Sequence, residues 1–148
     1  MAAANYYNVA AQIKAVIAAD PAGAIGSADV QIEQLPILDP QGIRKVYILT
    51  DDRQAPAGEQ MIMAGKSTDF LVTYSIWCFG FHLDEGQDAA KMRDDLMGAV
   101  EVAIMNDRTL NGSVRTCWIE GGAFEAADGN GIFRAGEIRL TCHMQALR

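Results

Sequence analysis

The sequence predicts an α+β fold, with a mostly antiparallel β-sheet and two main helices packed on one face of it. Three observations support this prediction: two long stretches with helical apolar spacing, several stretches rich in β-branched and aromatic residues, and turn sequences that join strands as hairpins. A chain of 148 residues has the size of one domain, residues 1–148, and can bury a core without disulfide staples.

The first element is a helix over Tyr6–Ala19. Its apolar residues form one stripe at helical spacing: Tyr6, Val9, Ala10, Ile13, Val16 and Ile17. Asp20 precedes Pro21, and a residue before proline is pushed out of the helical region, so the helix ends there. Lys14 is the one basic residue of the stretch, which favours core packing over a membrane-surface helix.

Two strands follow, Val30–Leu35 and Lys45–Thr50, and then a long connection, Asp51–Asp69. The connection carries an apolar trio, Met61, Ile62 and Met63. The trio is either the exposed tip of a functional loop or a short strand that pairs with Phe70 onward as a hairpin. The two interpretations are compatible, and both remain open at this point.

The strongest strand pattern covers Phe70–Leu83. Its first half alternates apolar and polar residues, whereas its second half is apolar on both faces. A strand that is apolar on both faces lies between two layers or is covered by a partner subunit. Trp77, Phe79 and Phe81 therefore join Met61, Ile62 and Met63 as candidate interface residues.

The second helix is expected over Gly86–Asn106. Its core face is predicted to hold five residues: Met92, Leu96, Val100, Ala103 and Ile104. A strand over Val114–Glu120 follows, is broken by two glycines, and continues over Ala123–Ala127. The sequence Asp-Gly-Asn-Gly at 128–131 predicts a hairpin turn into a last strand over Ile132–Leu147.

The sequence contains two partial ligand-binding motifs, and neither has the spacing that its ligand requires. Gly65-Lys66-Ser67 imitates a phosphate-binding loop, but the preceding glycine is out of place and a strand follows instead of a helix. Asp128-Gly129-Asn130 resembles the start of a calcium loop, but the later ligands are missing. We therefore predict no catalytic residue, no cofactor and no metal site.

The cysteines, Cys78, Cys117 and Cys142, are odd in number and widely spaced, which favours reduced, buried thiols in a cytosol. A nucleophilic Cys–His dyad would have to form across strands, for example Cys117 with His82 or His143, and nothing in the sequence supports that pairing. The preferred interpretation of these cysteines is structural.

Charge and hydropathy exclude further classes. The chain has 12 basic and 19 acidic residues, a formal net charge of −7, which disfavours a protein that coats nucleic acid. No apolar run approaches the roughly 20 residues of a membrane span, and the N-terminus lacks the pattern of a secretory signal.

The C-terminal part carries a resemblance. A helix ends in the sequence Ile-Met-Asn-Asp-Arg-Thr-Leu-Asn-Gly-Ser-Val at 104–114, and a Gly-rich strand pair and a final alternating strand follow. This resembles the tail terminator, or tail completion, proteins of long-tailed bacteriophages and phage-like particles. Thr109, Leu110, Gly112 and Val114 match the helix-to-strand step of that family, which is structural.

The resemblance implies a non-enzymatic virion subunit, found in the tail or neck and assembled in the cytoplasm of the bacterial host. Such proteins form a closed ring, usually a hexamer, that caps the tail tube and ends its polymerisation. The implied partners are further copies of the chain, the tail tube protein, and the head-tail connector or adaptor. DNA would pass through the lumen without specific binding. Candidate acids for the lumen or rim are Asp51, Asp52, Asp84 and Glu85.

Three alternatives stay open. The chain could be a neck or head-completion subunit on the portal side. It could instead belong to another class, a small-ligand-binding or cysteine-hydrolase α+β domain that uses Cys117 or His143. A tube-forming subunit is the third, although its pattern is usually more wholly β.

Overall fold

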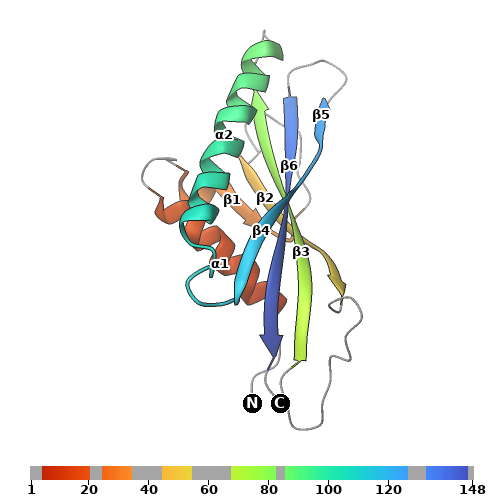
Figure 1. Cartoon of the computed structure of the whole chain (residues 1–148). Helices are drawn as coiled ribbons and strands as arrows, with labels where there is room; N and C mark the ends of the chain where they lie inside the picture. The colour runs from red at the N-terminus through yellow and green to blue at the C-terminus, as the bar shows by residue number, and fades with distance from the viewer. Residues whose placement is uncertain are drawn as a thin grey trace.

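The computed structural model describes residues 5–20, 25–34, 45–54, 68–82, 86–126 and 133–146. Within them, one sheet of six strands carries two α-helices on the same face (Figure 1). The predicted α+β class is confirmed. The elements in chain order are α1 (Tyr6–Ala19), the 3-10 helix η1 (Ser27–Asp29), β1 (Val30–Ile32), β2 (Val46–Gln54), β3 (Thr68–Phe81), α2 (Gly86–Asn106), β4 (Thr116–Gly121), β5 (Phe124–Ala126) and β6 (Phe133–Ala146).

The strands lie in the order β1-β2-β3-β6-β4, and β5 pairs with β6 beside β4. The β1–β2 pair is parallel, and the other described pairs are antiparallel. β3 and β6 pair along their full length, from Thr68 opposite Ala146 to Phe81 opposite Phe133. The sheet is therefore built around this long central pair, with β1 at one outer edge and β4 and β5 at the other.

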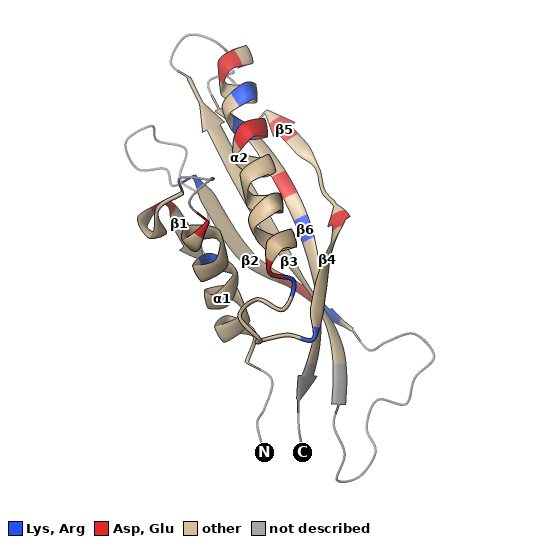
Figure 2. Cartoon of the chain, turned by 60° about the vertical axis from the view of Figure 1, so that its left-hand side comes forward, with Lys and Arg blue, Asp and Glu red and all other residues tan. Residues whose placement is uncertain are grey.

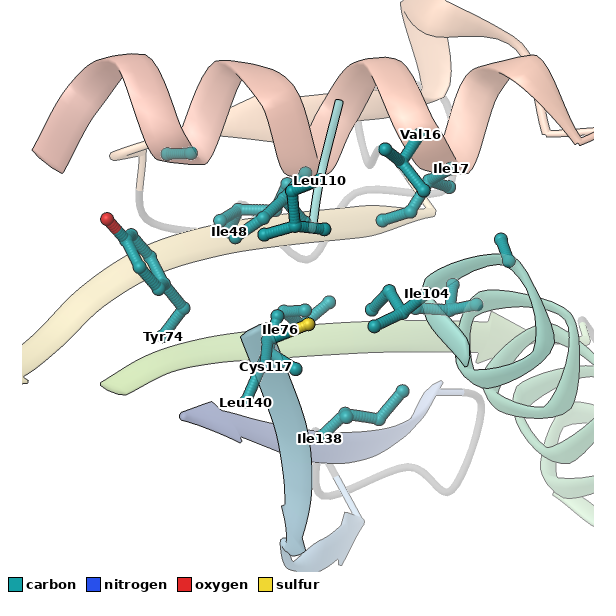
Figure 3. Close-up of a cluster of buried hydrophobic side chains, with 14 of the residues drawn as sticks. Val16, Ile17, Ile48, Tyr74, Ile76, Ile104, Leu110, Cys117, Ile138 and Leu140 are labelled. Atoms are coloured by element: carbon teal, nitrogen blue, oxygen red, sulfur yellow. The ribbon is translucent and has the colours of Figure 1, made fainter. Parts of the chain in front are cut away.

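The main core lies between the sheet and the helices. α1 packs on β1 and β2, and α2 packs on β3 and β6. Figure 3 shows the layers meeting through apolar side chains, among them Val16, Ile17, Ile48, Tyr74, Ile76, Ile104, Leu110, Cys117, Ile138 and Leu140. Burial of this apolar surface is the main favourable term that holds the helices on this face.

The first helix has the predicted bounds because local signals define both ends. The Asn5 side-chain carbonyl accepts a hydrogen bond from the Asn8 N–H at 2.9 Å, an N-cap that satisfies one of the free amides of the first turn. Five residues of the predicted stripe are buried: Val9, Ala10, Ile13, Val16 and Ile17. The core-packing interpretation of this helix is therefore confirmed.

The second helix lies unusually close to the sheet at Gly80. A Cβ atom built on Gly80 would stand 2.1 Å from the Ala89 carbonyl oxygen and 2.6 Å from the Arg93 backbone nitrogen. A glycine is thus required where β3 meets the first turns of α2. This contact line runs through Ala89 and Arg93, so Met92, predicted to be in the core, lies beside it and is 42% exposed.

Strand bounds differ from the prediction on the N-terminal side of the sheet. β1 ends at Ile32, short of the predicted Leu35, because Glu33 takes a left-handed conformation with φ 56°. The Glu33 carboxylate then accepts hydrogen bonds from the Thr50 N–H at 2.6 Å and from the Thr50 hydroxyl at 2.5 Å. This turn binds the end of β1 to β2 and stops the strand.

β2 is longer than predicted, since it continues past Thr50 to Gln54. β2 stays paired with β3 across a register shift between Thr50 and Asp52, a β-bulge that the polar sequence does not predict. Residues 51–54 and 68–69 therefore belong to strands instead of the predicted connection. Met61, Ile62 and Met63, and the hairpin considered for them, lie outside the described residues.

On the C-terminal side, the helix Gly86–Asn106 has its predicted bounds. β4 begins at Thr116, two residues after the predicted Val114, because a chain of turns occupies residues 108–113. In these turns Leu110 and Asn111 have positive φ, and Leu110 is fully buried. The predicted Ala123–Ala127 and Ile132–Leu147 correspond to β5 and β6.

Candidate interaction surfaces

The face of β2, β3 and β6 that points away from the helices forms the first candidate surface, here called the open sheet face. Trp77, Phe79 and Phe81 share it, as their alternation in β3 predicts. Phe79 packs with Tyr47 and Ala135 into a second, smaller apolar cluster, and Trp77 lies against that cluster. The aromatic residues predicted for an interface are thus gathered on one face of the sheet.

Much of this aromatic surface is already covered by contacts within the chain. The rings of Tyr47 and Phe79 meet edge to face with centroids 5.5 Å apart, and Phe79 is 7% exposed. The Phe81 ring packs against Phe133 with a centroid distance of 5.8 Å. Trp77 and Phe81 remain half-buried, so they keep surface that a partner could cover, whereas Phe79 keeps little.

A polar network lies on the open sheet face next to the aromatic cluster. The Ser75 hydroxyl donates a hydrogen bond to the Glu137 carboxylate across the β3–β6 pair. Arg139 donates to the Asp51 carboxylate at 2.6 Å and lies 3.6 Å from the Glu137 carboxylate. The hydrogen bond to Asp51 raises the pKa of the Arg139 guanidinium above its usual value.

Some of the acidic residues predicted for the lumen or rim have polar or cationic partners within the chain. Asp51 is paired with Arg139, so its charge is largely compensated on this face. The Asp52 carboxylate accepts the Arg53 N–H at 2.7 Å. Asp84 and Glu85 lie outside the described residues. Figure 2 shows acidic and basic residues interspersed along α2, where Lys91 pairs with Asp95 and Arg93 with Asp94, both at 2.8 Å.

A second candidate surface lies at the sheet edge, where the end of α2 meets β4; it is here called the edge hollow. It encloses about 260 Å³ and is lined by Ile104, Met105, Arg108, Cys117, Trp118 and Ile119. Arg108 donates to the Cys117 carbonyl oxygen at 3.0 Å, which ties the turn after α2 to β4. The hollow is mostly apolar with one cationic side chain at its wall.

Two exposed apolar residues of α2 stand at this end of the helix. Met105 is 66% exposed and Val102 is 52% exposed. The sequence contains one signal for them, a three-residue spacing on the helix face opposite the core stripe, which the predicted interface does not include. The hollow forms because β4 lies beside the end of α2, and no local sequence pattern predicts that placement.

The cysteines are buried and free, as predicted. Cys117 in β4 lies opposite Cys142 in β6, and both belong to the main core. His143 follows Cys142 in the strand and therefore points to the opposite face, and His82 follows β3 at the far end of the sheet from Cys117. The Cys–His dyad considered for a hydrolase is not assembled.

Among the described residues, no group of three metal-ligating side chains comes together, and no helix has the length and apolar character that crossing a membrane requires. The described residues instead form candidate contact surfaces: a partly aromatic sheet face, an edge hollow and exposed helix residues.

Comparison with known proteins places the fold. No protein-family model matches the chain, and no curated protein matches it. Among solved structures, 24 chains match. One of them is a chain from a structure described as the virion of a native gene transfer agent particle, with 13% identity and a TM-score of 0.53. The match covers 95% of this chain and 99% of that one, so the likeness is one of fold over nearly the whole of both.

Proposed function

We propose that the chain is a structural subunit of a phage or phage-like tail. In this proposal it forms a ring, a hexamer, that caps the tail tube, ends its polymerisation and offers the joining surface to the head connector. The observation that carries the proposal is the fold likeness to a chain of a gene transfer agent virion, which extends over 95% of this chain.

The sites support a protein that acts through its surface. The described residues assemble no Cys–His dyad and no metal cluster, whereas they gather half-buried aromatic residues on the open sheet face. A subunit of a closed ring needs two different contact surfaces, because each copy meets one neighbour on each side. We assign the open sheet face to one of these contacts.

The deciding experiment is deletion of the gene in its particle-producing strain, followed by electron microscopy of the tails. A ring that ends polymerisation predicts overlong tails, and normal length returns when the wild-type gene is supplied. Tail-less heads with free tails of normal length would instead indicate a neck subunit on the portal side. Particles of normal morphology would contradict both assignments.

The ring itself is tested by the mass of the purified protein in solution, with and without tail tubes. The proposal expects a closed oligomer that is present free or appears on the tubes. A second test addresses the enzyme alternative: replacement of both Cys117 and His143 by alanine is expected to leave particle assembly unchanged. Loss of assembly in that variant, with the fold intact, would favour a function that depends on these side chains.

A further inference from the structure

Cys117 and Cys142 occupy directly opposed positions of the antiparallel β4–β6 pair. Both side chains lie on the helix-facing side of the sheet and belong to the main core. Opposed residues of an antiparallel pair have Cα atoms roughly 4.5–5.5 Å apart. A disulfide spans Cα separations of roughly 4.4–6.8 Å, so the backbone already holds these two cysteines at a distance that the bond accepts.

Each of the two opposed thiols shifts the pKa of the other. Contact with the Cys142 thiol lowers the pKa of the Cys117 thiol. Burial opposes this effect, and the positive charge of Arg108 adds to it. Contact with the Cys117 thiol, together with burial, raises the pKa of Cys142. Because Cys117 also borders the edge hollow and Cys142 does not, we assign the first attack to the Cys117 sulfur.

The edge hollow lies beside Cys117, a residue that is itself 1% exposed. Cys117 and Arg108 both line it, and its volume is about 260 Å³. A water molecule in the liquid takes about 30 Å³, and hydrogen peroxide is little larger, so the hollow accommodates a peroxide molecule next to Cys117. Cys142 lies opposite Cys117 in the β4–β6 pair and is absent from the lining.

We propose that Cys117 and Cys142 form an oxidation site, in which a peroxide converts the two opposed thiols into a disulfide between β4 and β6. First, the Cys117 thiolate attacks one peroxide oxygen; an S–O bond forms, the O–O bond breaks, and the leaving hydroxide takes a proton to become water. The Cys142 sulfur then loses its proton and attacks the sulfenic sulfur. The S–S bond forms, the S–O bond breaks, and a second water leaves, so two thiols and one peroxide give one disulfide and two waters.

The third cysteine has neither of these features. Cys78 lies in β3 opposite Val46 and Gly136, so no cysteine faces it across either strand pair. Cys78 is also absent from the lining of the edge hollow, and burial raises its pKa. Cys78 is thus an internal control: the proposal requires that it stay reduced in the folded protein.

The test is peptide mapping of the purified full-length chain after treatment with hydrogen peroxide in native buffer. Free thiols are then alkylated and the protein is cut with trypsin, which releases residues 116–134 and 140–148 as separate peptides. The proposal expects these two peptides as one cross-linked species, two hydrogens lighter than their sum. The count of free thiols falls from three to one, and Cys78 is alkylated.

Matched variants separate the roles of the cysteines. Cys78→Ser retains the cross-link, whereas Cys142→Ser leaves Cys117 as a sulfenic acid that dimedone traps. Three outcomes in the wild-type chain would overturn the proposal: alkylation of all three cysteines after peroxide, a link that involves Cys78 or a second chain, or a link that appears only in denaturant. Because these readings use the wild-type protein, they hold even where a variant fails to fold.

Discussion

At the scale of single residues, Gly80 and Gly98 form a matched pair. An added Cβ at Gly80 would meet α2 backbone atoms at 2.1 Å and 2.6 Å, whereas at Gly98 it would meet nothing within 4 Å. We expect Gly80→Ala to lower the free energy of unfolding by about 1–3 kcal/mol, since α2 must move off the sheet. Gly98→Ala, on the exposed side of α2, is expected to raise it by about 0.5–1 kcal/mol. Chemical denaturation of both variants measures the difference, and equal midpoints would refute the close contact.

Cys78 gives the chain a predictable response to alkaline pH. Its pKa is raised in the folded protein by burial and then by Glu101, from an ordinary value of 9.0. The folded state therefore holds its proton more tightly than the unfolded state, so the stabilisation is complete below pH 9 and is lost as pH rises above it. We expect Cys78→Ala to reduce the slope of unfolding free energy against pH by about 1.4 kcal/mol per pH unit above that point.

Urea denaturation of the wild type and Cys78→Ala at several pH values between neutral and alkaline makes the comparison. The slope is compared, and not the stability itself, because removing the thiol also leaves a small void in the core. Parallel curves for the two proteins would show that Cys78 ionises equally well in both states.

At the scale of elements, the first helix depends on its N-cap. The Asn5 side chain accepts the Asn8 N–H at 2.9 Å, and the first turn carries no acidic residue that could replace it. We expect Asn5→Ala to cost about 0.5–2 kcal/mol of unfolding free energy, and Asn5→Asp to retain it, because aspartate caps as well. Thermal melts followed by circular dichroism test this; an unchanged alanine variant would mean that α1 is held by packing alone.

How far the sequence predicts an element depends on where its signals lie. The bounds of α1 follow from local features, a periodic stripe and Pro21, so they are predicted correctly. The extension of β2 through Asp51 and Asp52 comes from pairing with β3 across a bulge, and polar residues give no local sign of it. Likewise, the pairing of Cys117 with Cys142 depends on strand register, which places residues far apart in sequence opposite each other and has no local sign.

At the scale of the whole molecule, the predicted interface loop can be tested in the particle. Replacing Met61 and Met63 by aspartate is expected to weaken ring or tube assembly without unfolding the chain. Tail length by electron microscopy and far-ultraviolet circular dichroism of the isolated variant supply the two readings. A matched Gly98→Ala variant, altered on exposed α2 surface with nothing nearby, is expected to assemble normally. Normal tails from the double variant would remove this loop from the proposed interface.

The edge strands β1 and β4 have a consequence for behaviour at high concentration. β1 offers only three residues before the left-handed Glu33 turns the backbone away, and β4 is interrupted by a register shift between Ile119 and Gly121. Neither provides the long, flat row of amides and carbonyls that templates addition of a further strand. Within the described residues, these edges therefore offer no long template for edge-to-edge pairing, which disfavours fibre growth by strand addition.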